Sequence, residues 1–185
     1  MNIKKLAFTG VIAALSFAVF TFIRIPMPGN TSAVHLGNAV VVIGALVLGG
    51  FYGGLGGALG LVIGDLLSGW AVYAPLTLIL KFCIGLVTGL IAHRFGKIND
   101  INDPKKLFAW TLAASAGGLL LNVILSPLAN YLYNIWIIGK PAADVAFTWG
   151  IVASGINGGI SLIVAVAVYL ALRPALKKSG VFSVP

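Results

Sequence analysis

Charged residues are scarce in this chain, and glutamate is missing altogether. Only 9% of the 185 residues are charged, whereas 59% are hydrophobic, and the acidic side chains are limited to Asp65, Asp100, Asp103 and Asp144. A chain with so few polar groups cannot cover the surface of a separate soluble domain. We therefore predict a single integral membrane domain over residues 1–185.

Cysteine and nucleotide-binding motifs are also lacking. Cys83 is the only cysteine, which excludes an internal disulfide and any paired-thiol metal or redox site. Residues 54–59 end in leucine where the dinucleotide fingerprint needs glycine, and no Gly-Lys-Ser/Thr triplet forms a phosphate loop. We expect no metal site and no cofactor in this chain, which cannot hydrolyse ATP itself.

The sequence does contain a series of apolar blocks, each long enough to cross a membrane as a helix. A hydrocarbon core about 30 Å thick needs roughly 20 helical residues, and lipid permits only helices or closed barrels as spanning structures. The short alternating segments of a barrel are absent. We predict an all-α membrane protein, a bundle of six transmembrane helices with spans at 6–23, 35–49, 52–69, 74–93, 107–133 and 147–172.

Lysine and arginine fall unevenly on the two sides of this bundle. Six crossings put both termini on one side, which receives nine basic residues: Lys4, Lys5, Arg94, Lys97, Lys105, Lys106, Arg173, Lys177 and Lys178. The other side receives two, Arg24 and Lys140. Because cytoplasmic loops carry the excess of basic residues, both termini are predicted to be cytoplasmic in a multi-pass protein of the cell membrane. The net charge of +8 then reflects orientation and anionic lipid, and no nucleic-acid signal is present.

Small residues form a strip along the first predicted span, where Gly10, Ala14 and Ala18 repeat every four residues. Such a strip lets another helix approach closely. Two interpretations stay open: contact with a neighbouring span of this chain, or a docking face for another membrane subunit. The third predicted span carries glycines expected to pack closely within the chain, namely Gly53, Gly56, Gly57, Gly60 and Gly64.

Polar side chains inside the spans gather in the outer half of the predicted bundle. Each is costly in lipid and should face the bundle interior, which indicates a cavity open to the outside. The candidates for binding a small, polar, ring-bearing ligand are His35, Asn38, Tyr73, Lys81, Asn130, Tyr131, Asn134, Trp149 and Asn157. The asparagines supply donors and acceptors, and Tyr131 or Trp149 a stacking face. Trp70 and Trp136 are expected in the interfacial aromatic belt.

Two opposite charges, Asp65 and Lys81, lie within predicted spans. We expect them to form an ion pair, because an unpaired buried charge costs more than a paired one. If they neutralise each other, the pocket suits a pyrimidine or pyridine alcohol. If Lys81 or Arg24 is free, a carboxylate such as pantothenate is favoured instead.

Three stretches resemble the substrate-binding S components of energy-coupling factor (ECF) vitamin transporters: 26–38 (PMPGNTSAVHLGN), 64–69 (GDLLSG) and 73–81 (YAPLTLILK). The resemblance covers essentially the whole chain and is closest to the members for hydroxymethylpyrimidine or pyridoxine, with pantothenate-type members similar in outline. It implies that a vitamin binds from outside and is released inside, driven by a transmembrane coupling subunit (T component) and two ATPase subunits. It also implies that the strip on the first span meets the coupling subunit and that the connection 24–34 closes the site as a lid.

Two alternative functions, a self-sufficient carrier and an intramembrane peptidase, fit the sequence less well. A self-sufficient carrier, such as a proton symporter, needs a titrating group on the substrate path, and Asp65 is the sole intramembrane carboxylate. An intramembrane serine peptidase would use Ser154-Gly155 with His35, but the preceding glycine of the usual motif is missing and His35 has no evident partner. We therefore expect no enzymatic activity.

Overall fold

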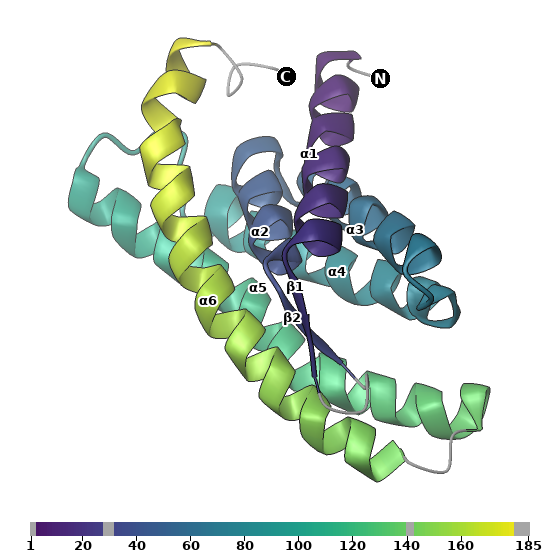
Figure 1. Ribbon diagram of the computed structural model, residues 1–185. Helices are drawn as coiled ribbons and strands as arrows, with labels where there is room; N and C mark the ends of the chain where they lie inside the picture. Colours follow the sequence, from purple (N-terminus) through teal and green to yellow (C-terminus); the bar gives the residue numbers. More distant parts are fainter. Residues whose placement is uncertain (1–2, 28–31, 140–142, 180–185) are drawn as a thin grey trace.

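The computed structural model describes residues 3–27, 32–139 and 143–179. Most of them are helical (Figure 1). The helices are α1 (Ile3–Phe22), α2 (Gly37–Leu48), α3 (Gly50–Leu67), α4 (Ala74–Gly89), α5 (Pro104–Tyr133) and α6 (Ala143–Lys178). A 3-10 turn leads into α4, and π-helical turns extend α4 and α5; they are η2 (Ala71–Tyr73), η3 (Leu90–Phe95) and η4 (Asn134–Ile138).

Five helical stretches of the described chain are long and apolar enough to cross a membrane: Ile3–Phe22, Gly50–Leu67, Ala71–Phe95, Pro104–Ile138 and Asp144–Lys178. They match five of the six predicted spans. The 12 residues of α2 extend about 18 Å at 1.5 Å per residue, well short of the hydrocarbon thickness. The helical membrane fold is confirmed, and the sixth crossing remains a prediction. The start of α1 and the end of α6 lie at the same end of the molecule (Figure 1).

The connection after α1 is more regular than the sequence indicated. We predicted a loop over 24–34 that acts as a lid, but β1 (Arg24–Pro26) and β2 (Ala33–His35) form an antiparallel pair in which Ile25 lies opposite Val34. Isoleucine and valine favour strands, and Pro26 is tolerated because a two-stranded ribbon has only edges. His35 therefore belongs to a strand and not to the second span. Residues 28–31, in the middle of the predicted lid, lie outside the described chain.

The boundary between α2 and α3 was predicted between residues 49 and 52, and the structure confirms it. Gly49 has φ +86°, a left-handed backbone conformation that favours glycine, and it separates Leu48 from Gly50. The break turns one apolar run into two helices that pack against each other.

Glycines of α3 allow its neighbours to approach at backbone distance, as predicted. A Cβ atom added at Gly53 would overlap the Gly44 backbone of α2, and one at Gly60 would overlap the Ala13 carbonyl of α1. Helix α4 packs on a further side of α3. Helix α3 is therefore the centre of a close-packed group with α1, α2 and α4.

Helix α1 buries one face and leaves the other open. Thr9, Ile12, Ser16 and Phe20 are buried. The opposite strip is not covered by the described chain: Gly10 and Ala14 are exposed, Ala18 is half-buried, and a Cβ atom added at Gly10 would meet nothing within 4 Å.

The connection between η3 and α5 is fastened to α6 by one side chain. Arg173 Nη2 donates to the carbonyl oxygens of Ile98 at 2.9 Å, Asn99 at 3.5 Å and Ile101 at 2.6 Å. Lys177 adds a contact from its Nζ to Asn102 Oδ1 at 3.3 Å. Three helices, α4, α5 and α6, are thus tied together at this end of the bundle.

Candidate functional site

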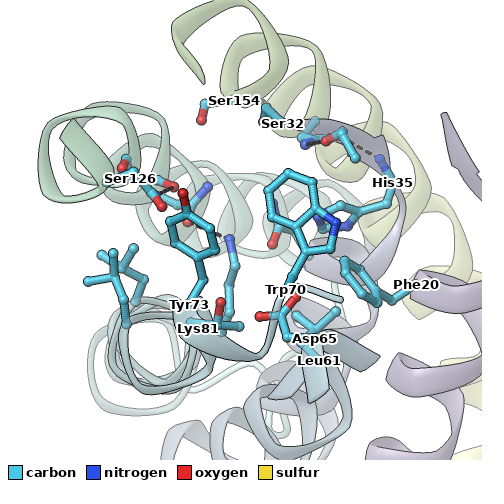
Figure 2. Close-up of a pocket in the computed structure, with 18 of the residues that line it drawn as sticks. Phe20, Ser32, His35, Leu61, Asp65, Trp70, Tyr73, Lys81, Ser126 and Ser154 are labelled. Carbon is cyan, nitrogen blue, oxygen red and sulfur yellow. Dashed lines mark hydrogen bonds between the residues drawn. The ribbon is translucent and has the colours of Figure 1, made fainter. Parts of the chain in front are cut away.

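A cavity of about 110 Å³ lies where α3, α4, α5 and α6 meet the β hairpin (Figure 2). Its walls combine polar and aromatic side chains from parts of the chain that are far apart in sequence. Of the predicted ligand-binding residues, the cavity brings together His35, Asn38, Tyr73, Lys81, Asn130 and Asn157.

The floor of the cavity holds a buried lysine. Lys81 Nζ donates to Asn122 Oδ1 at 2.9 Å, and both side chains are buried. Asp65 also lines the cavity, and its Oδ2 is buried without a hydrogen-bond partner. Among the described residues no direct ion pair joins Asp65 to Lys81, so the predicted pairing is replaced by a lysine–amide contact. The reason is that α5 places the side-chain amide oxygen of Asn122 within hydrogen-bonding distance of the Lys81 ammonium group.

Aromatic rings form a second wall. The Trp70 and Tyr73 ring centroids are 5.6 Å apart, and the Arg24 guanidinium lies 4.9 Å from the Trp70 ring centroid. The Arg24 guanidinium also lies 5.5 Å from the Phe20 ring centroid. Figure 2 shows the Trp70 indole within the cavity region, with Lys81 and Asp65 pointing to the same space. Trp70 was expected in the interfacial belt, yet it lines the cavity.

Two predicted stacking residues are elsewhere. Tyr131 and Trp149 do not line this cavity, although both belong to helices that do. Tyr131 lies with its ring centroid 5.1 Å from that of Phe147, at the contact between α5 and α6. Helical phase explains the difference, because Tyr131 follows Asn130 by 100° and points to another face.

A polar stripe runs along α5 toward the hairpin end of the bundle. Asn122, Ser126, Asn130 and Asn134 recur at four-residue intervals and so share one helix face. Asn130 Nδ2 donates to its own helix at the Ser126 carbonyl, 2.7 Å away, and Asn134 Oδ1 accepts from the Tyr73 hydroxyl at 2.6 Å. Asn130 and Asn134 were predicted from the sequence as ligand-binding residues, whereas Asn122 and Ser126 were not. Following the same spacing backward would have found them.

Asn134 lines a smaller hollow of about 70 Å³ that adjoins the main cavity. The two spaces share Trp70, Tyr73 and Asn130 among their walls. The site therefore continues from the buried lysine along α5 toward η4.

The hairpin closes a third side through β2. The His35 backbone N–H donates to Asn157 Oδ1 at 2.8 Å, and Asn157 Nδ2 donates to the Ala33 carbonyl at 3.0 Å. The His35 ring accepts at Nδ1 from the Gly37 N–H, 3.1 Å away, at the start of α2. Asn38 follows in the first turn of α2 and is 1% exposed.

Several polar atoms of the cavity residues lack a partner. Arg24 Nε, Asn38 Oδ1 and Asp65 Oδ2 are buried without a hydrogen bond. Buried polar groups in folded proteins are normally hydrogen-bonded, so these atoms mark places for ligand donors and acceptors. Within the described residues no group of three His, Cys, Asp or Glu side chains has the arrangement of a metal site. These atoms can bind the polar groups of a small molecule in the cavity.

Comparisons with known proteins agree with a membrane transport role. The family model described as "ECF-type riboflavin transporter, S component" matches residues 1–174. Proteins named "UPF0397 protein" from Streptococcus pneumoniae, strains Hungary19A-6 and CGSP14, are each 32% identical to this chain over 164 residues. Each alignment covers 89% of this chain and 86% of the relative.

Proposed function

This chain belongs to the family of ECF-type riboflavin transporter S components, and from that premise we propose that it is the vitamin-binding membrane subunit of an ATP-driven importer. The family consists of transporter subunits and not of enzymes. Its members function with a coupling subunit and ATPases, and we propose a T component and two ATPase subunits as the partners here. ATP is then used by the partners, while this chain captures the vitamin.

The ligand we propose is a vitamin with one polar aromatic ring, such as hydroxymethylpyrimidine or pyridoxine. The observation that carries this proposal is the cavity of about 110 Å³ with Trp70 and Tyr73 on one wall and the Lys81–Asn122 contact on its floor. A flat ring gains from aromatic walls. Ring nitrogens and hydroxyl groups need directional partners, which Asn38, Asp65 and Lys81 can supply.

Pantothenate is the second candidate, and a specific feature favours it. Two cationic side chains, Arg24 and Lys81, line the cavity together with a single carboxylate, Asp65. A ligand carboxylate would balance this excess and would accept charge-assisted hydrogen bonds. The family description names riboflavin, and a flavin with its sugar-alcohol chain would also have to occupy the neighbouring hollow near Asn134.

Roles in binding follow from the geometry. We propose that Lys81, Asn38, His35, Tyr73 and Asn130 contact the ligand. Asn134 would contact only a ligand long enough to enter the second hollow. Trp70 takes the stacking role that the sequence analysis gave to Tyr131 and Trp149.

The test begins with the small molecule that co-purifies with the detergent-solubilised chain, identified by mass spectrometry. Titration calorimetry then compares hydroxymethylpyrimidine, pyridoxine, pantothenate and riboflavin as ligands. We expect tight binding of one ring-bearing vitamin and weakening in Lys81→Met. Tight binding of pantothenate alone would overturn the ring-bearing ligand in favour of the second candidate, and absence of binding to all four would overturn both. Trp149→Ala is the matched control, because Trp149 lies off the cavity.

A self-sufficient carrier is the rival function. Vesicles that contain this chain alone, without ATP, should bind the vitamin but should not accumulate it against a gradient. Accumulation driven by a proton gradient would contradict the importer-subunit proposal. Adding the coupling subunit, the ATPases and ATP should restore uptake.

A further inference from the structure

The Asn157 side chain bonds the backbone of β2 in both directions. Its Oδ1 accepts from the His35 N–H at 2.8 Å, and its Nδ2 donates to the Ala33 carbonyl at 3.0 Å. Residues two apart in a strand turn their backbone groups to the same edge. The Asn157 amide therefore pairs with this edge of β2 as the peptide group of another strand would.

This edge of β2 has no neighbouring strand in the described chain. Strand β1 pairs with β2 in a two-stranded sheet, which leaves the opposite edge to be satisfied by another group. Unpaired backbone groups within a membrane cost several kcal/mol each. Asn157 is 6% exposed and projects from the middle of α6, so it supplies that pairing where water has little access.

The position of β2 determines one wall of the cavity. The His35 ring accepts from the Gly37 N–H at the start of α2, and its centroid lies 4.9 Å from that of Phe20 in an edge-to-face contact. Through His35, β2 is joined to α1 and α2, whereas through Asn157 it is joined to α6. Separation of β2 from α6 would move His35 away from the cavity.

We propose that Asn157 is a positioning residue that holds β2 against α6, keeps the His35 wall in place, and so slows release of the ligand. Its contribution to binding then acts through the backbone of β2. This inference rests on the proposed function only in requiring that a ligand occupies the cavity. The retention of β2 by Asn157 can be measured without any ligand.

The first experiment measures the hairpin in the ligand-free protein. A nitroxide label is attached to Ile25→Cys in β1, in a Cys83→Ala background, and its mobility is read by electron paramagnetic resonance. Ile25 is 67% exposed, so it accepts a label without repacking. Asn157→Leu removes both hydrogen bonds and should make the label more mobile. Unchanged mobility would overturn the proposal.

A control label separates a local from a general effect. Phe51→Cys is 58% exposed and lies at the start of α3, 14 residues before the cavity residue Asp65, and its label should report no change in Asn157→Leu. If both labels change, the variant has lost its fold, and Asn157→Asp decides instead. Aspartate keeps the acceptor for the His35 N–H but lacks the donor to Ala33. It should mobilise the Ile25 label alone, and failure to do so would contradict the proposal.

The second experiment measures release. Dissociation of hydroxymethylpyrimidine should accelerate roughly tenfold or more in Asn157→Leu, because the two hydrogen bonds that hold β2 against α6 are lost. The analogue 4-amino-2,5-dimethylpyrimidine, which lacks the hydroxyl group, should be affected by the same factor. An effect that disappears with one analogue would place Asn157 in direct contact with the ligand and overturn the indirect role.

The two proposals fail in different ways. If the parent protein binds no vitamin of the panel, the proposed function is wrong, and the label measurements still decide whether Asn157 retains β2. If the parent binds but release from Asn157→Leu is unchanged, the function stands and the inference fails. Asn130→Ala is a matched asparagine control, because Asn130 donates to its own helix and should leave the Ile25 label unaffected.

Discussion

Small residues serve different purposes on the two faces of α1. On the face toward α3, the backbone at Ala13 comes so close to Gly60 that a single added methyl group would overlap it. On the opposite face, Gly10 has open space around it and Ala14 is exposed. The same residue types thus occur where another helix of this chain is already in contact and where the described chain leaves the surface open. A small-residue pattern indicates close approach but does not say by which partner.

The largest loss of stability is expected at the close contact between α1 and α3. Gly60→Leu should destabilise the chain by about 3 kcal/mol or more, because overpacking against a backbone carbonyl leaves no flexible group to move. This loss is measured as a lower midpoint of thermal unfolding in detergent, with size-exclusion chromatography as the readout of folded protein. Gly10→Leu is the matched control and should leave the midpoint nearly unchanged. Equal losses in both variants would remove the distinction between the two faces.

The next effect concerns the open face. Ala14→Trp should weaken assembly with the coupling subunit at least tenfold, about 1.4 kcal/mol, since a bulky ring prevents close helix approach. Uptake should then be lost while vitamin binding by the isolated chain is retained. Ile63→Trp, at an exposed site on α3, is the control that should assemble normally. Loss of vitamin binding in Ala14→Trp would show that the strip serves the fold of this chain.

A third comparison sets the inner face of α5 against a site off the cavity. Asn122→Ala should cost roughly 1–3 kcal/mol of binding free energy, because it leaves the buried Lys81 ammonium without its 2.9 Å contact. Trp149→Ala should bind like the parent. Titration calorimetry measures both, and a larger loss in Trp149→Ala would place the ligand elsewhere.

Charge balance in the cavity allows a finer distinction between ligands. Lys81→Met should weaken binding of every candidate. The double variant with Asp65→Asn should recover much of the affinity for a neutral vitamin, because it also removes the carboxylate that Lys81 had balanced. A carboxylate ligand should show no recovery, since it has lost its own cation. The ratio of the two dissociation constants distinguishes pantothenate from pyridoxine.

The smallest functional effect is expected from cysteines that report orientation. In a Cys83→Ala background, Asp144→Cys near the start of α6 should react with an impermeant thiol reagent in intact cells, whereas Asn102→Cys should not. Both sites are exposed, so access depends on the side of the membrane. The reverse labelling pattern would invert the predicted topology and the outward direction of the cavity.

Much of this architecture follows from local chemistry that a sequence displays. Apolar length predicted the helices, and the predicted boundary between the second and third spans, residues 49–52, contains the α2–α3 break at Gly49. Asn38, Lys81 and Asn130 were assigned to one polar region because buried polar groups face inward, and they line one cavity.

What could not be predicted depends on rotation and on competition between partners. Trp70 and Trp149 both lie near the end of a membrane-spanning helix, but only Trp70 lines the cavity. Lys81 was expected either to pair with Asp65 or to be free for a ligand, and only the packing of α4 against α5 places Asn122 Oδ1 at 2.9 Å from it. The β hairpin is too short for a periodic signal, since each strand has three residues.

The contact of Arg173 with three carbonyl groups affects how the connection 96–103 can change during evolution. Surface loops usually tolerate inserted and deleted residues, because their backbone groups are satisfied by water. Here the carbonyls of Ile98 and Ile101 must stay in register with one guanidinium on another helix. An added residue would shift one acceptor out of reach. We therefore expect the length of this segment to vary less among homologues than its exposed side chains do.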